Sequence, residues 1–342
     1  MTILYLYAEL MGYQIPVLKE YTLKYNANVH VVHWDHKKLT PYIPPKINNV
    51  HYYNRSSYDY EALLQLVKEI KPDISFISGW MDNTYLKIGK ILKNNSIPVV
   101  AGCDTQASNS IKHKIGYFIF RFTYKKFFTH IWVAGPYQYE YARKLGFKKN
   151  QIIFNLYSAD VNSFGKNKNN NFAKKFLFLG RFEEIKGINI LLEAWRTIQN
   201  KKDWSLTFIG NGKLVDKIKN EPNIVVKDFM QPHDLINEIH QYGFMILPSL
   251  DEPWALVIHE AMSAGIPVLS SDVCGAAPVF ILPNYTGFTF KSEDVNDLIS
   301  KITTIMNMEE DILKRMSINA KARSTIITPE IVAASFISTL NS

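Results

Sequence analysis

The chain contains few cysteines and no long apolar run. Its 342 residues include only Cys103 and Cys274, so a disulfide scaffold is excluded and we interpret both as reduced thiols of a cytosolic protein. No apolar stretch approaches the roughly 20 residues that a membrane-spanning helix needs. Residues 1–9 lack both the basic start and the long apolar core of a signal peptide. We therefore expect a cytoplasmic protein.

Two further absences narrow the function. No Gly-x-Gly-x-x-Gly follows the first expected strand, which argues against an NAD-dependent oxidoreductase. The formal net charge is +8, but the chain shows no zinc-ligand spacing, recognition helix or RNA-binding aromatic motif. We therefore expect no nucleic-acid partner, and a non-enzymatic binding protein is the weakest alternative.

What the sequence does contain is a regular alternation of apolar strands and amphipathic helices. Hydrophobic residues make up 47% of the chain, and its length suits two cores better than one. Glycines follow several of the expected strands, which predicts doubly wound parallel sheets with the ligand at the carboxyl ends of the strands. In the first half we expect strands at 3–7, 28–34, 73–78, 98–102, 130–134 and 151–154, and helices at 15–25, 60–70, 85–94 and 137–145.

The most informative segment follows an expected buried strand in the second half. Glu252 and Glu260 bracket seven residues, with Pro253 suited to the first turn of a helix and Gly265 to its end. On a helix that starts near Pro253, the two carboxylates lie on the order of 12 Å apart. The unpaired amides of the helix start, with the helix dipole, would form an anion site between them. A pyrophosphate on these amides with hydroxyl groups at each carboxylate describes a sugar nucleotide.

A second segment, residues 175–195, is expected to form a strand, a glycine-hinged loop and an amphipathic helix. Its loop contains Gly180, Arg181, Lys186 and Gly187. A guanidinium binds two phosphate oxygens at once and a nearby ammonium adds a point charge. Both could stabilise the negative charge that grows on a departing diphosphate. For either cation alone, an ordinary surface position is the alternative.

Together, these two segments resemble the Glu-x7-Glu motif and the Gly-Arg…Lys-Gly segment of glycosyltransferase family 4. The resemblance implies retaining sugar transfer and an α/β fold of the GT-B class, in which two Rossmann-like doubly wound parallel-sheet domains face a central cleft. We expect an N-terminal, acceptor-side domain at 1–164 and a C-terminal, nucleotide-sugar-binding domain at 165–328. The polar run 165–171 is the expected linker. A helix at about 329–342 is expected to pack back on the N-terminal domain.

The resemblance also implies roles for individual residues. Arg181 and Lys186 would grip the diphosphate, Glu260 the ribose hydroxyls, and Glu252 a hydroxyl of the donor sugar. Because the chain has no clear Asp-x-Asp pair to hold a cation, we expect neither a metal nor a cofactor. The expected donor site comprises Gly12, Gly180, Arg181, Lys186, Gly210, Gly212, Asp228, Phe229, Glu252, Trp254, Ala255, Leu256, Val257 and Glu260.

Three positions depart from the family pattern. The loop after the first strand has only Gly12, where many members have two glycines. Asp104 takes the place of a histidine; it could contact a sugar or acceptor hydroxyl and favour positive charge on the anomeric carbon, or it could cap a helix. Ala255 replaces a glycine, and its methyl group restricts close approach of the backbone. The candidate catalytic residues are Arg181, Lys186, Glu252 and Asp104.

Positive charge is concentrated in one window. Residues 101–170 carry eleven lysines and arginines against Asp104, Glu140 and Asp160, a net of +8 that equals the charge of the whole chain. Within it, residues 112–128 are both basic and aromatic. Such a segment suits an anionic membrane surface; the alternative is a partly buried helix with solvated lysines. The residues expected to contact membrane or acceptor are Lys112, Lys114, Phe118, Arg121, Lys125 and Lys126.

The sequence thus predicts a metal-independent glycosyltransferase that moves a sugar from a UDP- or GDP-sugar to a glycan or lipid-linked acceptor. We expect it to act in bacterial surface polysaccharide synthesis, such as that of O-antigen, capsule or lipopolysaccharide, in the cytoplasm or at the inner face of the plasma membrane. The alternatives are another GT-B enzyme of sugar nucleotides, such as an epimerase, or a non-enzymatic binder.

Overall fold

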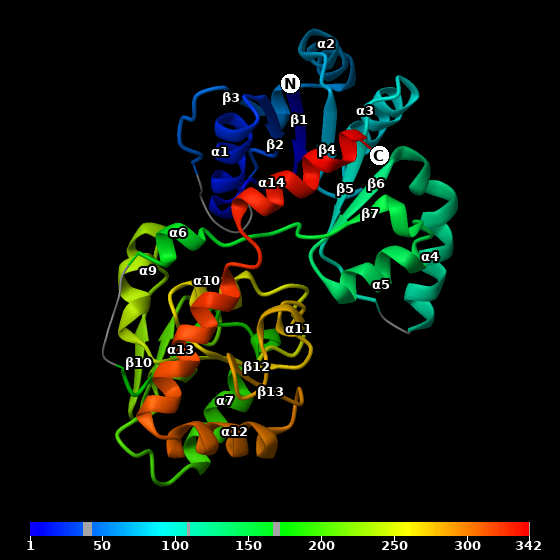
Figure 1. Ribbon diagram of the computed structural model, residues 1–342. Coiled ribbons are helices and arrows are strands. Elements are labelled where there is room, and N and C mark those ends of the chain that lie inside the picture. The colour runs from blue at the N-terminus through cyan, green and yellow to red at the C-terminus, as the bar shows by residue number, and fades with distance from the viewer. Residues whose placement is uncertain (37–42, 108–109, 167–171, 342) are drawn as a thin grey trace. The chain divides into compact units, whose positions relative to one another are not determined.

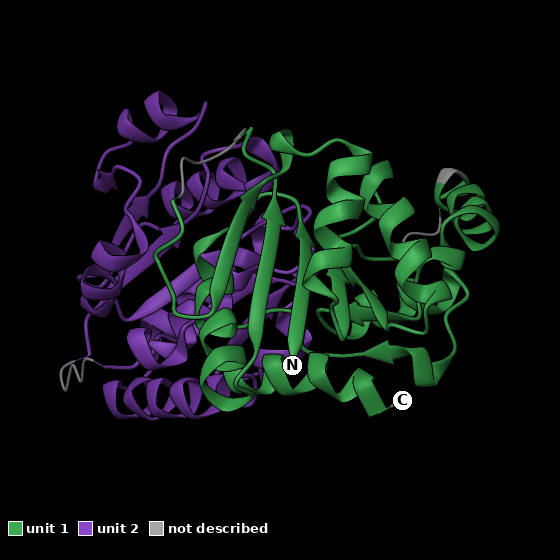
Figure 2. Ribbon diagram, turned by 90° about the horizontal axis from the view of Figure 1, so that it is seen from above, with its two compact units in different colours: residues 1–158, 329–342 green, residues 159–328 purple. Residues whose placement is uncertain are grey.

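The computed structural model describes residues 1–36, 43–107, 110–166 and 172–341 of the chain (Figure 1). The chain divides into two compact units, each with its own parallel sheet (Figure 2). The N-terminal unit comprises residues 1–158 with 329–342, and the C-terminal unit comprises residues 159–328. Among the described residues, no helix is long and apolar enough to cross a lipid bilayer.

The N-terminal unit is built on a parallel sheet with the strand order β3-β2-β1-β4-β5-β6-β7. The order reverses between β1 and β4, as in Rossmann-type sheets. Its strands are β1 (Thr2–Tyr7), β2 (Asn28–His33), β3 (Val50–Asn54), β4 (Ile74–Ile77), β5 (Val99–Cys103), β6 (His130–Val133) and β7 (Ile152–Ile153). Its helices are α1 (Ile15–Lys24), α2 (Tyr60–Ile70), α3 (Asn83–Asn94), α4 (Ile111–Thr123), α5 (Pro136–Lys144) and α14 (Pro329–Ile337).

The last helix, α14, belongs to the N-terminal core. It packs against α1 (Figure 1). The ring of Phe336 on α14 stacks on Trp132 with 5.3 Å between ring centroids, and it meets Tyr5 and Phe76 edge-on. All four side chains are buried, so the C-terminal segment fills a space over the sheet that would otherwise expose aromatic surface.

The C-terminal unit has a second parallel sheet with the order β10-β9-β8-β11-β12-β13. Here the order reverses between β8 and β11, and the site described below lies at this point. Its strands are β8 (Lys175–Leu179), β9 (Ser205–Ile209), β10 (Ile224–Lys227), β11 (Phe244–Leu247), β12 (Val268–Ser271) and β13 (Gly287–Phe290). Its helices are α6 (Val161–Phe164), α7 (Ile188–Thr197), α8 (Val215–Lys219), α9 (Pro232–Glu238), α10 (Leu256–Ser263), α11 (Ala277–Phe280), α12 (Val295–Asn307) and α13 (Glu310–Ser324).

The doubly wound parallel sheets predicted from the sequence are confirmed, whereas two details differ. β3 was not expected, because its sequence, Val-His-Tyr-Tyr-Asn, contains only one aliphatic residue. The chain passes to the C-terminal unit after Ser158, earlier than the expected boundary at 164/165, because α6 packs on α10 and the Ala159 amide donates to His259 Nδ1 at 3.0 Å. Most of the expected linker, residues 167–171, lies outside the described residues.

Candidate active site

The two sequence motifs meet at the point where the strand order of the C-terminal sheet reverses. The first motif follows β8 and the second follows β11, and these strands are hydrogen-bonded neighbours. The two loops are also in backbone contact, since the Leu250 amide donates to the Ile185 carbonyl at 2.8 Å. Gly187 has φ +68°, and a Cβ atom there would lie 1.8 Å from the Pro248 carbonyl oxygen. Only glycine permits this approach of the two loops.

This approach places the side chains of Lys186 and Glu252 in direct contact. The Lys186 Nζ and Glu252 Oε2 atoms form an ion pair at 2.5 Å, and the two side chains are only 14% and 12% exposed. The Ser249 hydroxyl donates to the same carboxylate oxygen at 3.3 Å. The sequence assigned these residues separate roles on phosphate and sugar; the structure joins them into one unit.

The start of the following helix differs from the expectation. α10 begins at Leu256 and not near Pro253, so Glu260 lies one turn into the helix rather than two. Because Glu252 lies outside this helix, the distance expected between the two carboxylates, which assumed a single helix, does not apply. The Ala276 amide donates to the Trp254 carbonyl at 2.7 Å, which holds the chain before the helix extended against the loop after β12. Ala255 then turns into the helix with φ +77° and ψ +66°. This left-handed conformation favours glycine, so the alanine at this position is strained.

Glu260 stands in a different environment from Glu252. Its carboxylate has no hydrogen-bond or ion-pair partner among the side chains and backbone groups that the structure describes. Its residue retains some exposed surface, yet the protein atoms packed around the carboxyl group raise its pKa to about 7, because burial disfavours the charged form. Such a carboxylate can accept hydrogen bonds from a bound ligand without first breaking a contact.

The second cation of the first motif, Arg181, can also bind a ligand. Arg181 is exposed and makes no ion pair within the described residues. It follows Gly180, and the glycines after β8 and β9 bring their loops together: a Cβ atom on Gly210 would lie 1.9 Å from the Gly180 carbonyl oxygen, and one on Gly212 would lie 2.6 Å from that of Phe182. Beyond the next strand, β10, the expected residues Asp228 and Phe229 are both exposed.

Asp104 belongs to the N-terminal unit, where it follows β5. The Tyr157 hydroxyl donates to its Oδ2 atom at 3.2 Å, and Gln138 Nε2 donates to its backbone carbonyl at 3.1 Å. The Tyr13 ring packs edge-on against Tyr157 with 5.4 Å between centroids. The capping alternative is wrong for α4, because the N-cap of that helix is Ser110. Tyr157 was missed, since nothing in the sequence links it to an aspartate so distant along the chain.

Gly12 lies in the same unit and begins a short 3-10 turn after β1, Gly12–Gln14. The other expected donor residues belong to the C-terminal unit. The structure brings together the residues of the two motifs around β8 and β11, and it places Gly12 and Asp104 on the carboxyl side of the other sheet.

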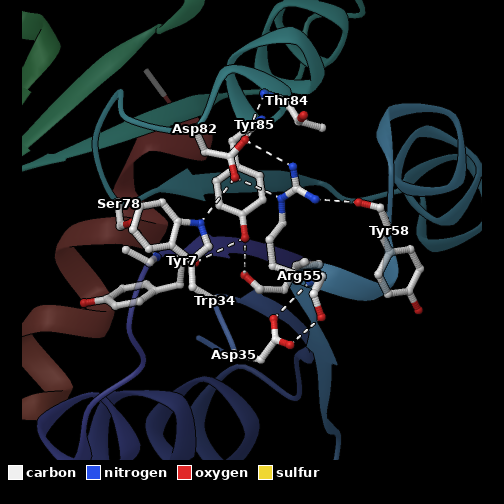
Figure 3. A network of polar contacts seen from close by, with 12 residues as sticks. Tyr7, Trp34, Asp35, Arg55, Tyr58, Ser78, Asp82, Thr84 and Tyr85 are labelled. Atoms are coloured by element: carbon white, nitrogen blue, oxygen red, sulfur yellow. Dashed lines mark hydrogen bonds and ion pairs between the residues drawn. The ribbon is translucent and has the colours of Figure 1, made fainter. Parts of the chain in front are cut away.

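A further polar network lies at the same edge of the N-terminal sheet (Figure 3). Arg55, which follows β3, donates from Nε to the carboxylate of Asp82 at 2.9 Å, and Trp34 Nε1 donates to Asp82 at 3.3 Å. The Tyr85 hydroxyl donates to the Tyr7 carbonyl at 3.2 Å. These contacts fix the loops after β1, β2, β3 and β4 against the start of α3. This network could not be predicted from the sequence, because its members come from separate segments.

Comparison with known proteins agrees with this geometry. Residues 161–323 match the model of the family described as glycosyl transferases group 1. An uncharacterized glycosyltransferase of Methanocaldococcus jannaschii is 30% identical over 154 residues, which are 42% of this chain and 41% of that protein. An uncharacterized 41.2 kDa protein in the cps region of Klebsiella pneumoniae is 28% identical over 174 residues, 48% of each chain. The matches span less than half the length of these curated relatives.

Similarity to solved structures extends over the whole chain. Sucrose-phosphate synthase of Thermosynechococcus elongatus superposes with a TM-score of 0.77 at 16% identity, covering 100% of this chain and 98% of that one. HepE of Anabaena, in complex with UDP, gives a TM-score of 0.75 at 16% identity and covers 100% of both chains. These likenesses, together with the two parallel sheets, show the GT-B fold that the sequence predicted.

Proposed function

We propose that this protein is a retaining glycosyltransferase of family 4, which moves a sugar from a nucleoside-diphosphate sugar to a glycan or lipid-linked acceptor. The observation that carries the proposal is the junction of the two motifs at the strand-order reversal of the C-terminal sheet, where Rossmann-type sheets bind their ligands. The family match of residues 161–323 supports it. So does the binding of UDP by HepE, which shares the fold.

In this proposal each charged group has a chemical task. Arg181 and Lys186 neutralise the charge that develops on the leaving diphosphate. The Lys186 ammonium has three donors, so it can bind a phosphate oxygen while it remains paired with Glu252. That pairing fixes the direction of the Glu252 carboxylate toward a donor-sugar hydroxyl. Glu260, which has no competing partner in the described chain, accepts hydrogen bonds from the ribose hydroxyls.

The N-terminal unit supplies the second part of the proposal. The Tyr157 hydroxyl donates to the Asp104 carboxylate and orients it. There it would accept a hydrogen bond from a sugar or acceptor hydroxyl and favour positive charge at the anomeric carbon. Because two cations and helix amides serve the diphosphate, we propose that transfer needs no divalent metal ion. The donor is a UDP- or GDP-sugar.

The biological setting is proposed from the relatives. The similar Klebsiella pneumoniae protein is described by its place in the cps region. We therefore propose a role in bacterial surface polysaccharide synthesis, at the cytoplasmic side of the membrane that carries lipid-linked acceptors.

The experiment that tests the function measures release of nucleoside diphosphate from a panel of UDP- and GDP-sugars in a coupled assay. A thermal-shift screen selects the donor first, because a ligand at about 100 times its dissociation constant stabilises the fold by roughly 2.7 kcal/mol. Arg181→Ala should lower turnover by about 100-fold or more. Arg315→Ala is the matched control, since that arginine is also exposed and lies on α13; it should leave turnover unchanged. Equal rates in wild type and the Arg181 variant would refute the assignment.

A GT-B enzyme that epimerises a sugar nucleotide is the second candidate. It would convert one sugar nucleotide into another without an acceptor, whereas a transferase makes a new glycosidic bond and leaves a free nucleoside diphosphate. Product analysis by mass spectrometry separates the two outcomes directly.

A further inference from the structure

The surface of α4 carries an apolar stripe that no described residue of the unit covers. Ile111, Ile115, Phe118, Ile119 and Phe122 follow the i, i+4, i+7, i+8, i+11 spacing of one helix face. Their side chains are between 48% and 76% exposed. Phe118 and Phe122 touch each other, with 4.7 Å between ring centroids. Contiguous apolar patches of this kind mark interaction sites on soluble proteins.

The opposite face of the same helix is firmly packed. Phe120 is buried, with its ring 4.7 Å from that of Trp80 and 6.2 Å from that of Phe147. Tyr117 packs edge-on against Tyr141 of α5 at 5.5 Å. The orientation of α4 is therefore set by its own core contacts, and the stripe on the other side faces outward as a consequence. The partly buried helix that the sequence offered as the alternative is confirmed for Tyr117 and Phe120, which are buried, whereas Phe118 and Phe122 are exposed.

The ionised side chains of the segment that contains the stripe are all of one sign. Residues 105–139 contain five lysines and arginines and no aspartate or glutamate. Among the described residues, Lys114, Arg121, Lys125 and Lys126 form no salt bridge. Burial and then repulsion from Arg121 and Lys148 lower the pKa of Lys125, which shows that these cations crowd one another. Such a cluster attracts any anionic surface that approaches it.

We propose that this face of α4 docks on an anionic phospholipid membrane, with Phe118, Phe122 and the isoleucines at the level of the headgroups and the flanking cations on lipid phosphates. An apolar face bordered by lysine and arginine is the arrangement of helices that lie in a membrane interface. A second copy of the same face is a poor occupant, because its charges would oppose cations with cations. The surface does not depend on the donor site, so either proposal can fail without the other.

The first experiment measures co-sedimentation with vesicles of phosphatidylcholine alone and of phosphatidylcholine mixed with phosphatidylglycerol. The wild type should bind the anionic vesicles and not the neutral ones, and added salt should weaken binding. Neutralising Lys114, Lys125 and Lys126 to Gln should reduce the affinity by roughly 100-fold, since each charge near an anionic surface contributes about fivefold. The matched control changes Lys213, Lys217 and Lys219, which are exposed in the C-terminal unit, and should bind nearly as the wild type does.

The second experiment isolates the apolar contact. Phe118→Ser with Phe122→Ser should weaken binding at least tenfold, and the residual binding should depend more steeply on salt. The control replaces Leu23 and Ile318 by Ser, because these are 76% and 68% exposed elsewhere on the surface. A fluorophore on Phe118→Cys reports insertion directly by a blue shift, and it labels that site alone because Cys103 and Cys274 are buried.

Three results would overturn the proposal. The wild type could fail to bind anionic vesicles at low salt, or both control variants could lose as much affinity as the α4 variants. Alternatively, concentration-dependent self-association in sedimentation equilibrium, abolished by the Phe118/Phe122 change and unaffected by lipid, would assign the face to contact between copies. Circular dichroism and a melting curve for each variant confirm that it remains folded, as expected for changes at exposed positions.

Discussion

Glu260 offers the sharpest test of the donor site, because its pKa of about 7 lies in an accessible range. If its ionised carboxylate accepts hydrogen bonds from the ribose, nucleotide affinity must rise as pH rises through 7. At pH 6 only about one carboxyl in ten is ionised, and at pH 8 about nine in ten are. The dissociation constant for UDP or GDP should therefore fall by up to about tenfold between these values. Glu260→Gln removes this titration.

The same group makes an opposite prediction for stability. Its folded pKa of about 7 exceeds the unfolded value of 4.5, so between these two values the folded state binds more protons and stability falls as pH rises. The pKa difference of about 2.5 units corresponds to a loss of at most roughly 3 kcal/mol in the free energy of unfolding as the pH rises. Because the residue is partly exposed, we expect a loss of about 1–3 kcal/mol. Glu260→Gln should therefore stabilise the ligand-free protein at pH 8 and leave it nearly unchanged at pH 4.5.

Isothermal titration calorimetry from pH 5.5 to 8.5 measures the first effect, and melting curves at both ends of the range measure the second. The nucleotide's own phosphate also titrates near pH 6, so the quantity that decides is the difference between wild type and Glu260→Gln. Parallel affinity curves for the two proteins would refute the ribose contact. If Glu260→Gln binds the nucleotide weakly but has a higher melting temperature at pH 8, a purely structural role of Glu260 is excluded.

The remaining predictions concern the other charged groups. Activity should survive an excess of EDTA, and complete loss that added metal restores would contradict metal independence. Asp104→Asn should lower turnover at least tenfold in a stably folded protein. Tyr157→Phe should cause a smaller loss, because it removes only the hydrogen bond that orients the Asp104 carboxylate. Unchanged turnover in the Asn variant would show that Asp104 is not part of the site. Lys186→Met should destabilise the protein by about 2–4 kcal/mol, because it removes the ammonium that forms an ion pair with the Glu252 carboxylate. Adding Glu252→Gln should recover part of this loss in a double-mutant cycle monitored by urea unfolding.

The regular elements could be predicted from the sequence because their signals are local. β1 and β8 are apolar runs whose side chains are almost all buried, and α2 follows the predicted bounds closely, with Asp59 as its cap. The strand β3 lacked such a signal, since it is a partly exposed edge strand of mixed composition. The start of α10 was wrong because contacts with the loop after β12, and not local propensity, hold Trp254 and Ala255 out of the helix.

Candidate site residues could be named from the sequence, but the contacts between them could not. Arg181, Lys186, Glu252 and Glu260 lie in two motifs whose residue types indicate phosphate and hydroxyl binding. That Lys186 reaches Glu252 depends on the close contact between Gly187 and Pro248, which is a property of the folded sheet. The hydrogen bond between Tyr157 and Asp104 also depends on the folded sheet. So does the choice of the α4 face that remains exposed among the described residues.

The two glutamates of the second motif show what the structure adds to a pattern of two identical residue types. Glu252 is fixed by an ion pair and by the Ser249 hydroxyl, so its carboxylate is held in one orientation. Glu260 has neither, and burial alone raises its pKa to about 7. Carboxyl groups whose surroundings differ in this way divide their tasks. The fixed, charged group suits the reacting end of the donor, where geometry controls rate. The unpaired group suits reversible recognition of the nucleoside, because two ribose hydroxyls can donate the hydrogen bonds that the described protein groups around Glu260 do not.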